Sequence, residues 1–300
     1  MASARDKPQL LLDRVARMAA RASRPLMIGS EKVVVQTASV PALSHFTGWL
    51  CDRRVPKPLL KAAINRFSKV YQVDLSEVAK PLSTFETFNA FFTRQLRPGA
   101  RPIDQDPAVV VSPADAKLQT LCRIPRSGQV EQVKGRRYSV AALLGDYADA
   151  STYRDGSLAT LYLSPRDYHR VHCPVDGKIT SWRYIPGRFF PVNRLAVDHI
   201  DGLFTVNERV VIHMETEEHG KLVAVMVGAA NVARITLPFD DVTPYRRRKT
   251  TTRVEPSSPL SVARGDELGV FNLGSTVVLL ASNPNLLAHR VMEGESVRMG

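Results

Sequence analysis

The segment FNLGSTVVLL, residues 271–280, joins a small-residue turn to the start of an apolar run. Gly274, Ser275 and Thr276 suit a bulge where the chain enters a strand, and Val277–Leu280 is typical of a buried strand. Similar short runs recur past Pro102, between Gly, Pro, Asn and Asp. They predict strands at Val109–Val111, Ala159–Leu163, Lys178–Tyr184, Arg209–His213 and Leu222–Val227. Together these runs predict a mainly antiparallel β core.

The residues before this core have helical periodicity instead. Apolar residues recur at helical spacing in Leu10–Arg24, Leu43–Leu50 and Leu59–Tyr71, with the basic residues largely outside the apolar stripes. A further helix is expected after an N-cap at Ser83 or Thr84, with Phe85, Phe88, Phe91 and Phe92 on one face. Within the β core, helices are expected at Val140–Leu144 and from Pro165. The expected class is α+β: N-terminal amphipathic helices, then a mainly antiparallel β core.

Composition places the chain among globular proteins. Its 300 residues weigh 33.2 kDa, and 44% are hydrophobic and 23% charged. No apolar run reaches the roughly 18 to 20 residues of a spanning helix, and charged residues interrupt the place of a signal-peptide core. Three widely spaced cysteines, Cys51, Cys122 and Cys173, form no C-x-x-C pair, which predicts neither a disulfide framework nor a zinc site. We expect a protein of a reducing compartment that does not cross a membrane.

The positive charge is concentrated in the first third of the chain. The total is 41 − 29 = +12, of which residues 1–100 contribute 16 − 7 = +9 and the remainder 25 − 22 = +3. Such an excess implies a polyanionic partner, nucleic acid or anionic lipid. The sequence has no nucleic-acid-binding fingerprint, whereas cationic helices with an apolar face suit a lipid surface or packing on the rest of the chain. A second basic stretch, Pro244–Pro259 with Arg246, Arg247, Arg248 and Lys249, suits a solvated loop or a phosphate- or lipid-facing one.

An aspartate and two histidines in predicted turns could carry chemistry. Asp115 lies in VSPADA (111–116), where a turn residue is the simplest interpretation. His169 and His172 lie in a turn flanked by Pro165 and Pro174, which would hold an acid–base group rigidly. Two histidines three apart could also bind a metal on a helix, but no third ligand has a suitable spacing, so we predict no metal site.

Ser275 has three interpretations. It could be a structural residue of a strand-entry bulge. A hydrolase nucleophile would need G-x-S-x-G, but Leu273 and Val277 occupy the glycine positions. In a self-processing site, the absence of a side chain leaves the Gly274 carbonyl open to the Ser275 hydroxyl, and attack turns the peptide bond into an ester. The proton would pass to a histidine oriented by a carboxylate, and Asp115 and His172 supply these types.

A set of motifs in fixed order resembles the phosphatidylserine decarboxylase proenzymes of the bacterial, membrane-associated type. The matching segments are FFTRQLRPGARPID (91–104), VSPADA (111–116), YLSPRDYHRVHCP (162–174), IPGRFFPVN (185–193), LFTVNERV (203–210), VGAANV (227–232) and FNLGSTV (271–277). Two features depart from the family pattern: Ala116 replaces the usual glycine after the aspartate, and residues 1–30 extend beyond the usual start.

The resemblance implies roles for four residues. Asp115, His172 and Ser275 match the family's self-cleavage triad, and cleavage between Gly274 and Ser275 would yield a β chain, 1–274, and an α chain, 275–300. Ser275 would become a covalent pyruvoyl group, the cofactor, which forms a Schiff base with the substrate amine. His169 would be the acid that protonates the carbanion equivalent. The implied reaction, part of phospholipid biosynthesis, converts phosphatidylserine to phosphatidylethanolamine and CO₂.

The resemblance also implies partners and a location. Residues 1–100 would be the membrane-associating region and 101–300 the catalytic domain, held peripherally on the cytoplasmic side of the cell membrane. The expected partners are phosphatidylserine, an anionic membrane surface, the α chain for the β chain, and a second αβ unit in a homodimer, but not nucleic acid.

Three other functions stay open on the sequence alone. They are a soluble amino-acid decarboxylase with the same pyruvoyl chemistry, a nonenzymatic membrane- or nucleic-acid-binding protein on a β scaffold, and a Ser-His-Asp hydrolase.

Overall fold

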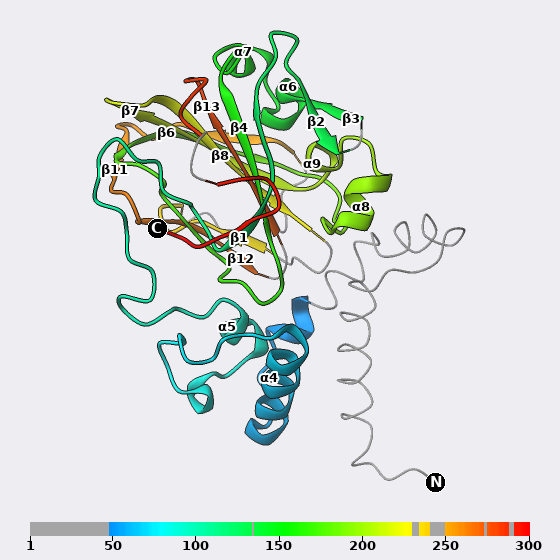
Figure 1. Cartoon of the computed structure of the whole chain (residues 1–300). Coiled ribbons are helices and arrows are strands. Elements are labelled where there is room, and N and C mark those ends of the chain that lie inside the picture. The colour runs from blue at the N-terminus through cyan, green and yellow to red at the C-terminus, as the bar shows by residue number, and fades with distance from the viewer. Residues whose placement is uncertain (1–47, 134, 230–233, 241–249, 273–274, 288–290) are drawn as a thin grey trace.

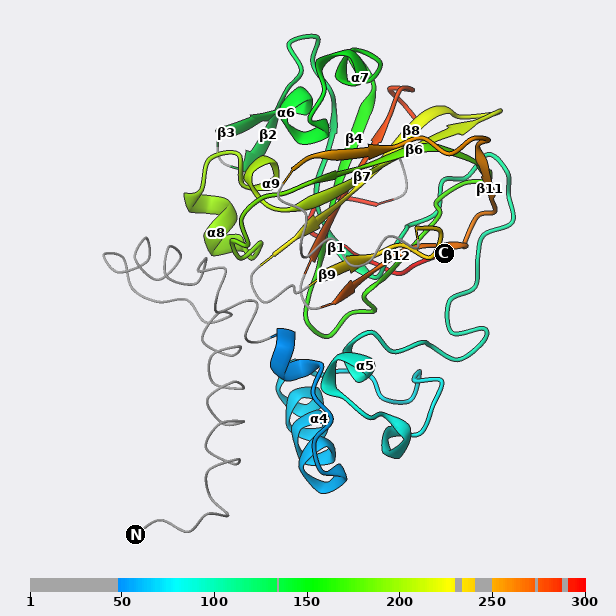
Figure 2. The same ribbon diagram turned by 180° about the vertical axis from the view of Figure 1, so that it is seen from behind.

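The computed structural model describes residues 48–300 apart from 134, 230–233, 241–249, 273–274 and 288–290. A small helical unit lies at one end of a β core in both views (Figure 1, Figure 2). The α+β class is confirmed, because helices come first and the core that follows is an antiparallel sheet. The expected helix at Leu10–Arg24, most of the Leu43–Leu50 stripe and the basic run Arg246–Lys249 lie outside the described residues.

The core is built on one large antiparallel sheet. Within the described residues its strand order is β10-β6-β7-β8-β13-β4-β1-β14, and β11 also pairs with β6. A three-stranded sheet, β5-β12-β9, and a hairpin, β2-β3, accompany it. The bounds are β1 Ala116–Arg123, β2 Gln129–Val133, β3 Arg136–Ser139, β4 Ser157–Leu163, β5 Arg170–His172, β6 Gly177–Ile185, β7 Arg209–Thr216, β8 Gly220–Gly228, β9 Arg234–Thr236, β10 Thr252–Val254, β11 Leu260–Val262, β12 Glu267–Asn272, β13 Ser275–Ala281 and β14 Ser296–Val297.

Strand β13 lies in the middle of the large sheet and is buried along its whole length. It pairs with β8 on one edge and β4 on the other. Because successive side chains point to opposite faces, Val277 and Leu279 enter one apolar core while Val278 and Leu280 enter a second. Burial on both faces explains why this strand is a continuous apolar run rather than an alternating one.

Short helices cover the second core. They are α6 Val140–Leu144, α7 Tyr147–Ser151, α8 Arg194–His199 and α9 Leu203–Val206. Side chains of α6, α8 and α9 pack into that core. The helix predicted at Val140–Leu144 is confirmed, and it is capped by the Ser139 hydroxyl at its start and by Gly145, with φ of 71°, at its end.

The helical unit has a small core of its own. It contains a helical turn at residues 48–51, α4 Lys57–Tyr71, the 3-10 turn η1 Leu82–Thr84 and α5 Phe88–Phe92. Its core side chains are Leu60, Ile64, Val73, Val78, Phe85 and Phe91. None of the described helices is long and apolar enough to cross a membrane.

Three sequence-based expectations are wrong in detail. Residues 109–111 form no strand, because Val111 makes a single backbone bond to Pro174 O (3.0 Å) rather than a ladder. The N-cap of α5 is Thr87, whose hydroxyl accepts from Ala90 N (3.0 Å), and not Ser83 or Thr84. No helix starts at Pro165: the Asp167 carboxylate accepts from Ser164 N (2.6 Å), and this local bond closes a turn instead.

Candidate functional site

Ser275 is the first residue of β13, and its side chain is fully buried. In the sheet it lies between Leu163 at the end of β4 and Gly228 at the end of β8. A hydroxyl without exposure to water depends on protein groups for its hydrogen bonds. Its reactivity therefore depends on which side chain the fold brings to it.

The fold brings His169 to this hydroxyl. β4 ends at Leu163, directly opposite Ser275, and residues 164–168 then form a turn that returns the chain to the same place. The His169 Nδ1 atom lies 3.4 Å from Ser275 Oγ, at the long end of the hydrogen-bonding range. A serine hydroxyl beside an imidazole nitrogen is the usual arrangement for activating a nucleophile.

The second ring nitrogen of His169 determines which tautomer faces Ser275. Nε2 lies 3.1 Å from the carbonyl oxygen of Ser164. A carbonyl accepts only, so Nε2 carries the proton and Nδ1 is left as an acceptor for the Ser275 O–H. Burial lowers the pKa of His169 to about 3, and the positive charge of Arg94 contributes to this shift. His169 is therefore a neutral imidazole whose free lone pair faces the serine.

Helix α5 packs against the same site. The Phe92 ring stacks on the His169 imidazole with centroids 4.1 Å apart. Asn89 donates to Asn272 Oδ1 (2.9 Å), at the end of β12 and three positions before Ser275. The periodicity of the phenylalanines indicates only a helix stripe, so sequence analysis missed both contacts, and no local pattern reveals them.

His172 lies in a different environment from His169. Its Nδ1 donates to Gly265 O (2.7 Å), and its Nε2 accepts from the Tyr168 hydroxyl (3.3 Å). Burial lowers the pKa of His172 below its ordinary value. Nothing that the structure describes joins this ring to Ser275 by a hydrogen bond.

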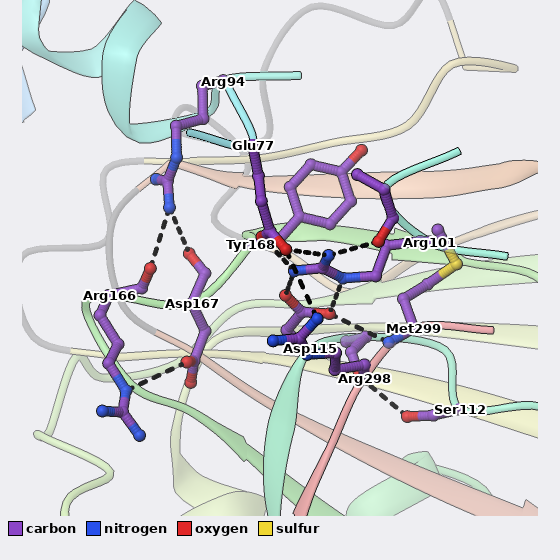
Figure 3. Close-up of polar contacts among 12 residues, drawn as sticks. Glu77, Arg94, Arg101, Ser112, Asp115, Arg166, Asp167, Tyr168, Arg298 and Met299 are labelled. Atoms are coloured by element: carbon purple, nitrogen blue, oxygen red, sulfur yellow. Dashed lines mark hydrogen bonds and ion pairs between the residues drawn. The ribbon is translucent and has the colours of Figure 1, made fainter. Parts of the chain in front are cut away.

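Asp115 is held by Arg101 and by the C-terminal segment (Figure 3). Arg101 binds both carboxylate oxygens, with Nε to Oδ1 at 2.8 Å and Nη2 to Oδ2 at 2.5 Å. The backbone N–H of Met299 donates to Oδ1 (3.0 Å). Arg101 also contacts Glu77 (2.8 Å), so its charge is shared between two carboxylates. The aspartate is thus rigid and fully bonded.

The four candidate residues therefore fall into two groups. His169 and Ser275 are in direct contact, whereas the segments of Asp115 and His172 are joined through the backbone, because His172 N donates to Pro113 O (2.8 Å). Among the described contacts no hydrogen bond links Asp115 to His172. The triad that the resemblance implies stays a prediction, and geometry adds His169 as a second candidate for the processing base. In the described part of the chain, no cluster of three or more His, Cys, Asp or Glu residues could hold a metal ion.

Comparison with known proteins assigns this chain to a family. The model of the phosphatidylserine decarboxylase family matches residues 88–300. The chain belongs to the phosphatidylserine decarboxylase family. It is 42% identical over 262 residues to the phosphatidylserine decarboxylase proenzyme of Anaeromyxobacter sp. (strain K), covering 86% of this chain and 92% of the relative. The proenzyme of Bordetella avium (strain 197N) is 45% identical over 242 residues, with 79% and 81% covered. The resemblance read from the motifs is confirmed.

The charge state of His169 can be measured in the intact Ser275→Ala chain by ¹⁵N spectroscopy of labelled histidine. We expect the His169 ring to stay neutral, with its proton on Nε2, from pH 8 to about pH 4, because burial disfavours the charged form. A histidine in the unfolded chain titrates near pH 6.5. His169→Gln identifies the signal by its loss. Protonation of the ring near pH 6.5, or a proton on Nδ1, would contradict the assignment.

Proposed function

We propose that this protein is a self-processing, pyruvoyl-dependent phosphatidylserine decarboxylase, cut between Gly274 and Ser275. One observation carries the processing step: the buried Ser275 hydroxyl faces an unprotonated nitrogen of His169 at 3.4 Å. The products would be a β chain of residues 1–274 and an α chain of residues 275–300.

The first step needs a nucleophile and a base, and this chain has both in contact. Ser275 Oγ attacks the carbonyl carbon of Gly274 while its proton passes to His169 Nδ1, and the peptide bond becomes an ester. β-Elimination then releases the β chain as a carboxylate, and hydrolysis with loss of ammonia leaves the pyruvoyl group on residue 275. The Ser164 carbonyl supports this step, because it stabilises the Nε2 proton as the ring gains positive charge.

This assignment differs from the one that the resemblance implies, in which His172 is the processing base and His169 acts later. The two roles of His169 are compatible in space. Once residue 275 carries the cofactor, His169 is still the titratable side chain beside it, so it is our candidate for moving a proton to the substrate carbon. Asp115 and His172 would then support the arrangement from the adjoining segment.

The site fits the cofactor, because residue 275 is buried among apolar strands and faces a neutral imidazole. A pyruvoyl group there supplies a carbonyl that takes up the electrons left when CO₂ departs from the substrate. The surrounding side chains exclude water, and His169 and Ser164 orient the proton transfers.

Features of the helical unit favour a substrate that lies in a membrane. On α4 and the turn before it, the exposed cations are Arg53, Arg54, Lys57, Lys61, Arg66 and Lys69. The partly exposed Trp49 ring lies beneath the Arg53 guanidinium (4.2 Å). Each cation near an anionic bilayer contributes about 1 kcal/mol. We infer that this unit docks peripherally on the cytoplasmic face of the membrane. The homodimer of αβ units stays a prediction, which light scattering of the solubilised protein would measure.

Ser275→Ala should leave a single chain of 33.2 kDa, because the nucleophile is gone. The wild-type protein should give two chains, of which the shorter has no N-terminal amine, and should release CO₂ from phosphatidylserine vesicles. Intact mass and CO₂ release measure both outcomes. Ser181→Ala, which removes another buried hydroxyl in β6, is the matched control and should cleave normally. An active wild-type chain of unbroken mass would refute the proposal, and release of CO₂ from free serine instead of the lipid would favour the soluble alternative.

His169→Ala should slow self-cleavage by about 100- to 10,000-fold, the usual contribution of a general base. His172→Ala should slow it less, because its ring bonds to Gly265 and Tyr168 rather than to Ser275. The measurement is the intact mass of each freshly refolded variant over time. Normal cleavage in His169→Ala combined with blocked cleavage in His172→Ala would restore the assignment that the resemblance implies.

Lys61→Glu/Lys69→Glu should weaken flotation with phosphatidylserine vesicles, because both lysines lie on the exposed side of α4. Wild-type binding to the vesicles should also fall in 1 M salt, where the Debye screening length is roughly 3 Å. Lys117→Glu/Lys178→Glu makes the same charge change on exposed positions of the β core and is the matched control. Equal flotation of both double variants would place the docking surface elsewhere.

A further inference from the structure

Arg94 is a buried arginine with unused hydrogen-bond donors. It is 4% exposed. Its Nη2 donates to the carbonyl oxygens of Arg166 (2.9 Å) and Asp167 (3.5 Å), as Figure 3 shows. Its Nε and Nη1 atoms are also buried, and no acceptor for them occurs among the described residues. Burying a polar group without a partner is unfavourable, and more so when the group is charged.

Other buried arginines of this protein are engaged more completely. Arg101 and Arg183 each contact two carboxylates, and Arg209 uses all three of its nitrogens on backbone carbonyls. No carboxylate lies within ion-pair distance of Arg94 in the described part of the chain. The negative charges of Asp115, Asp167 and Glu77 act on Arg94 only from beyond contact distance. Its charge is therefore taken out of water without a carboxylate in contact, an arrangement that an anionic ligand would compensate.

Arg94 lies next to the reacting groups. It follows α5, whose Phe92 stacks on His169, and its Nη2 bonds hold the turn that carries His169. Its positive charge also contributes to the lowered pKa of His169, after burial. The two carbonyl bonds fix the guanidinium, so its unused N–H groups have a set direction.

We propose that Arg94 binds the phosphodiester of the lipid headgroup, an inference that rests on the proposed function. The headgroup carries two anions. Tight binding of the carboxylate would stabilise the very charge that must leave as neutral CO₂, and so would oppose the reaction. The phosphodiester keeps its charge throughout, and a planar guanidinium is well suited to its oxygens. Arg94 thereby distinguishes a phosphorylated serine from free serine.

The test is calorimetric titration of the self-cleaved protein with glycerophosphoglycerol, a phosphodiester without amine or carboxylate, and separately with 3-hydroxypropionate, a carboxylate without phosphate. Arg94→Met should weaken phosphodiester binding by about 10- to 100-fold, which is the usual contribution of hydrogen bonds to a charged group. The phosphodiester affinity of Arg94→Lys should fall between those of the wild type and Arg94→Met, since lysine keeps the charge and loses the planar donors. Carboxylate binding should not change.

Arg97→Met is the matched control, because Arg97 is an exposed cation three residues on, bonded to Val78 O; it should bind the phosphodiester as the wild type does. In vesicle assays Arg94→Lys should raise KM more than it lowers kcat, since the phosphodiester is bound equally in ground and transition states. Self-cleavage and a thermal melt show whether each variant folds. If Arg94→Met does not fold, the phosphodiester affinity of Arg94→Lys decides the test.

Three results would overturn the proposal: unchanged phosphodiester affinity in a folded Arg94 variant, no phosphodiester binding by the wild type, or loss of carboxylate binding instead. The last would assign Arg94 to the carboxylate. Failure of the proposed function is a separate result, because the wild-type protein would then release no CO₂ from phosphatidylserine whatever the titration gives.

Discussion

The proposed chemistry of this protein depends on the orientation of one imidazole ring. Three groups from different parts of the chain hold His169: the Phe92 ring stacks on its face, the Ser164 carbonyl binds Nε2, and the Ser275 hydroxyl lies at Nδ1. A ring held on its face and at both nitrogens has little freedom to rotate. It keeps one tautomer, and that tautomer has its lone pair toward the serine. Loss of any one contact would leave a histidine in the same place without a defined direction for the proton.

The burial of this ring is as important as its orientation. β13 lies between β8 and β4 with apolar cores on both faces, so the Ser275–His169 pair is removed from water. A dry interior strengthens every polar interaction and penalises every unpaired charge. It keeps His169 neutral, and in the proposed reaction it prevents water from competing with the serine for the neighbouring carbonyl. The same dry interior makes it costly that Arg94 has no carboxylate in contact.

The elements of the core could be predicted from the sequence, because buried strands and capped helices leave local patterns. The apolar run at Val277–Leu280 and the helix at Val140–Leu144 are examples. The geometry of the site could be predicted only in part, for a local reason. A helix from Pro165 would put His169 and His172, three positions apart, on one face. The chain instead forms a turn followed by the short strand β5, so His169 lies just before the strand and His172 at its end. That one local difference separates the two rings.

Contacts between distant segments leave no local pattern, and they join the two halves of the proposed function. Asn89 bonds to Asp52 (2.8 Å), next to the exposed turn that carries Trp49, and also to Asn272 (2.9 Å) at the end of β12. Three residues later in α5, Phe92 stacks on His169. A unit that only held the protein on a bilayer would not need buried polar bonds to the strand ahead of the nucleophile. Because α5 supplies part of the wall of the site, displacement of the helical unit would disturb both His169 and the end of β12. In the proposed function, docking and chemistry would thus depend on the same short helix, as a substrate that stays in the bilayer requires.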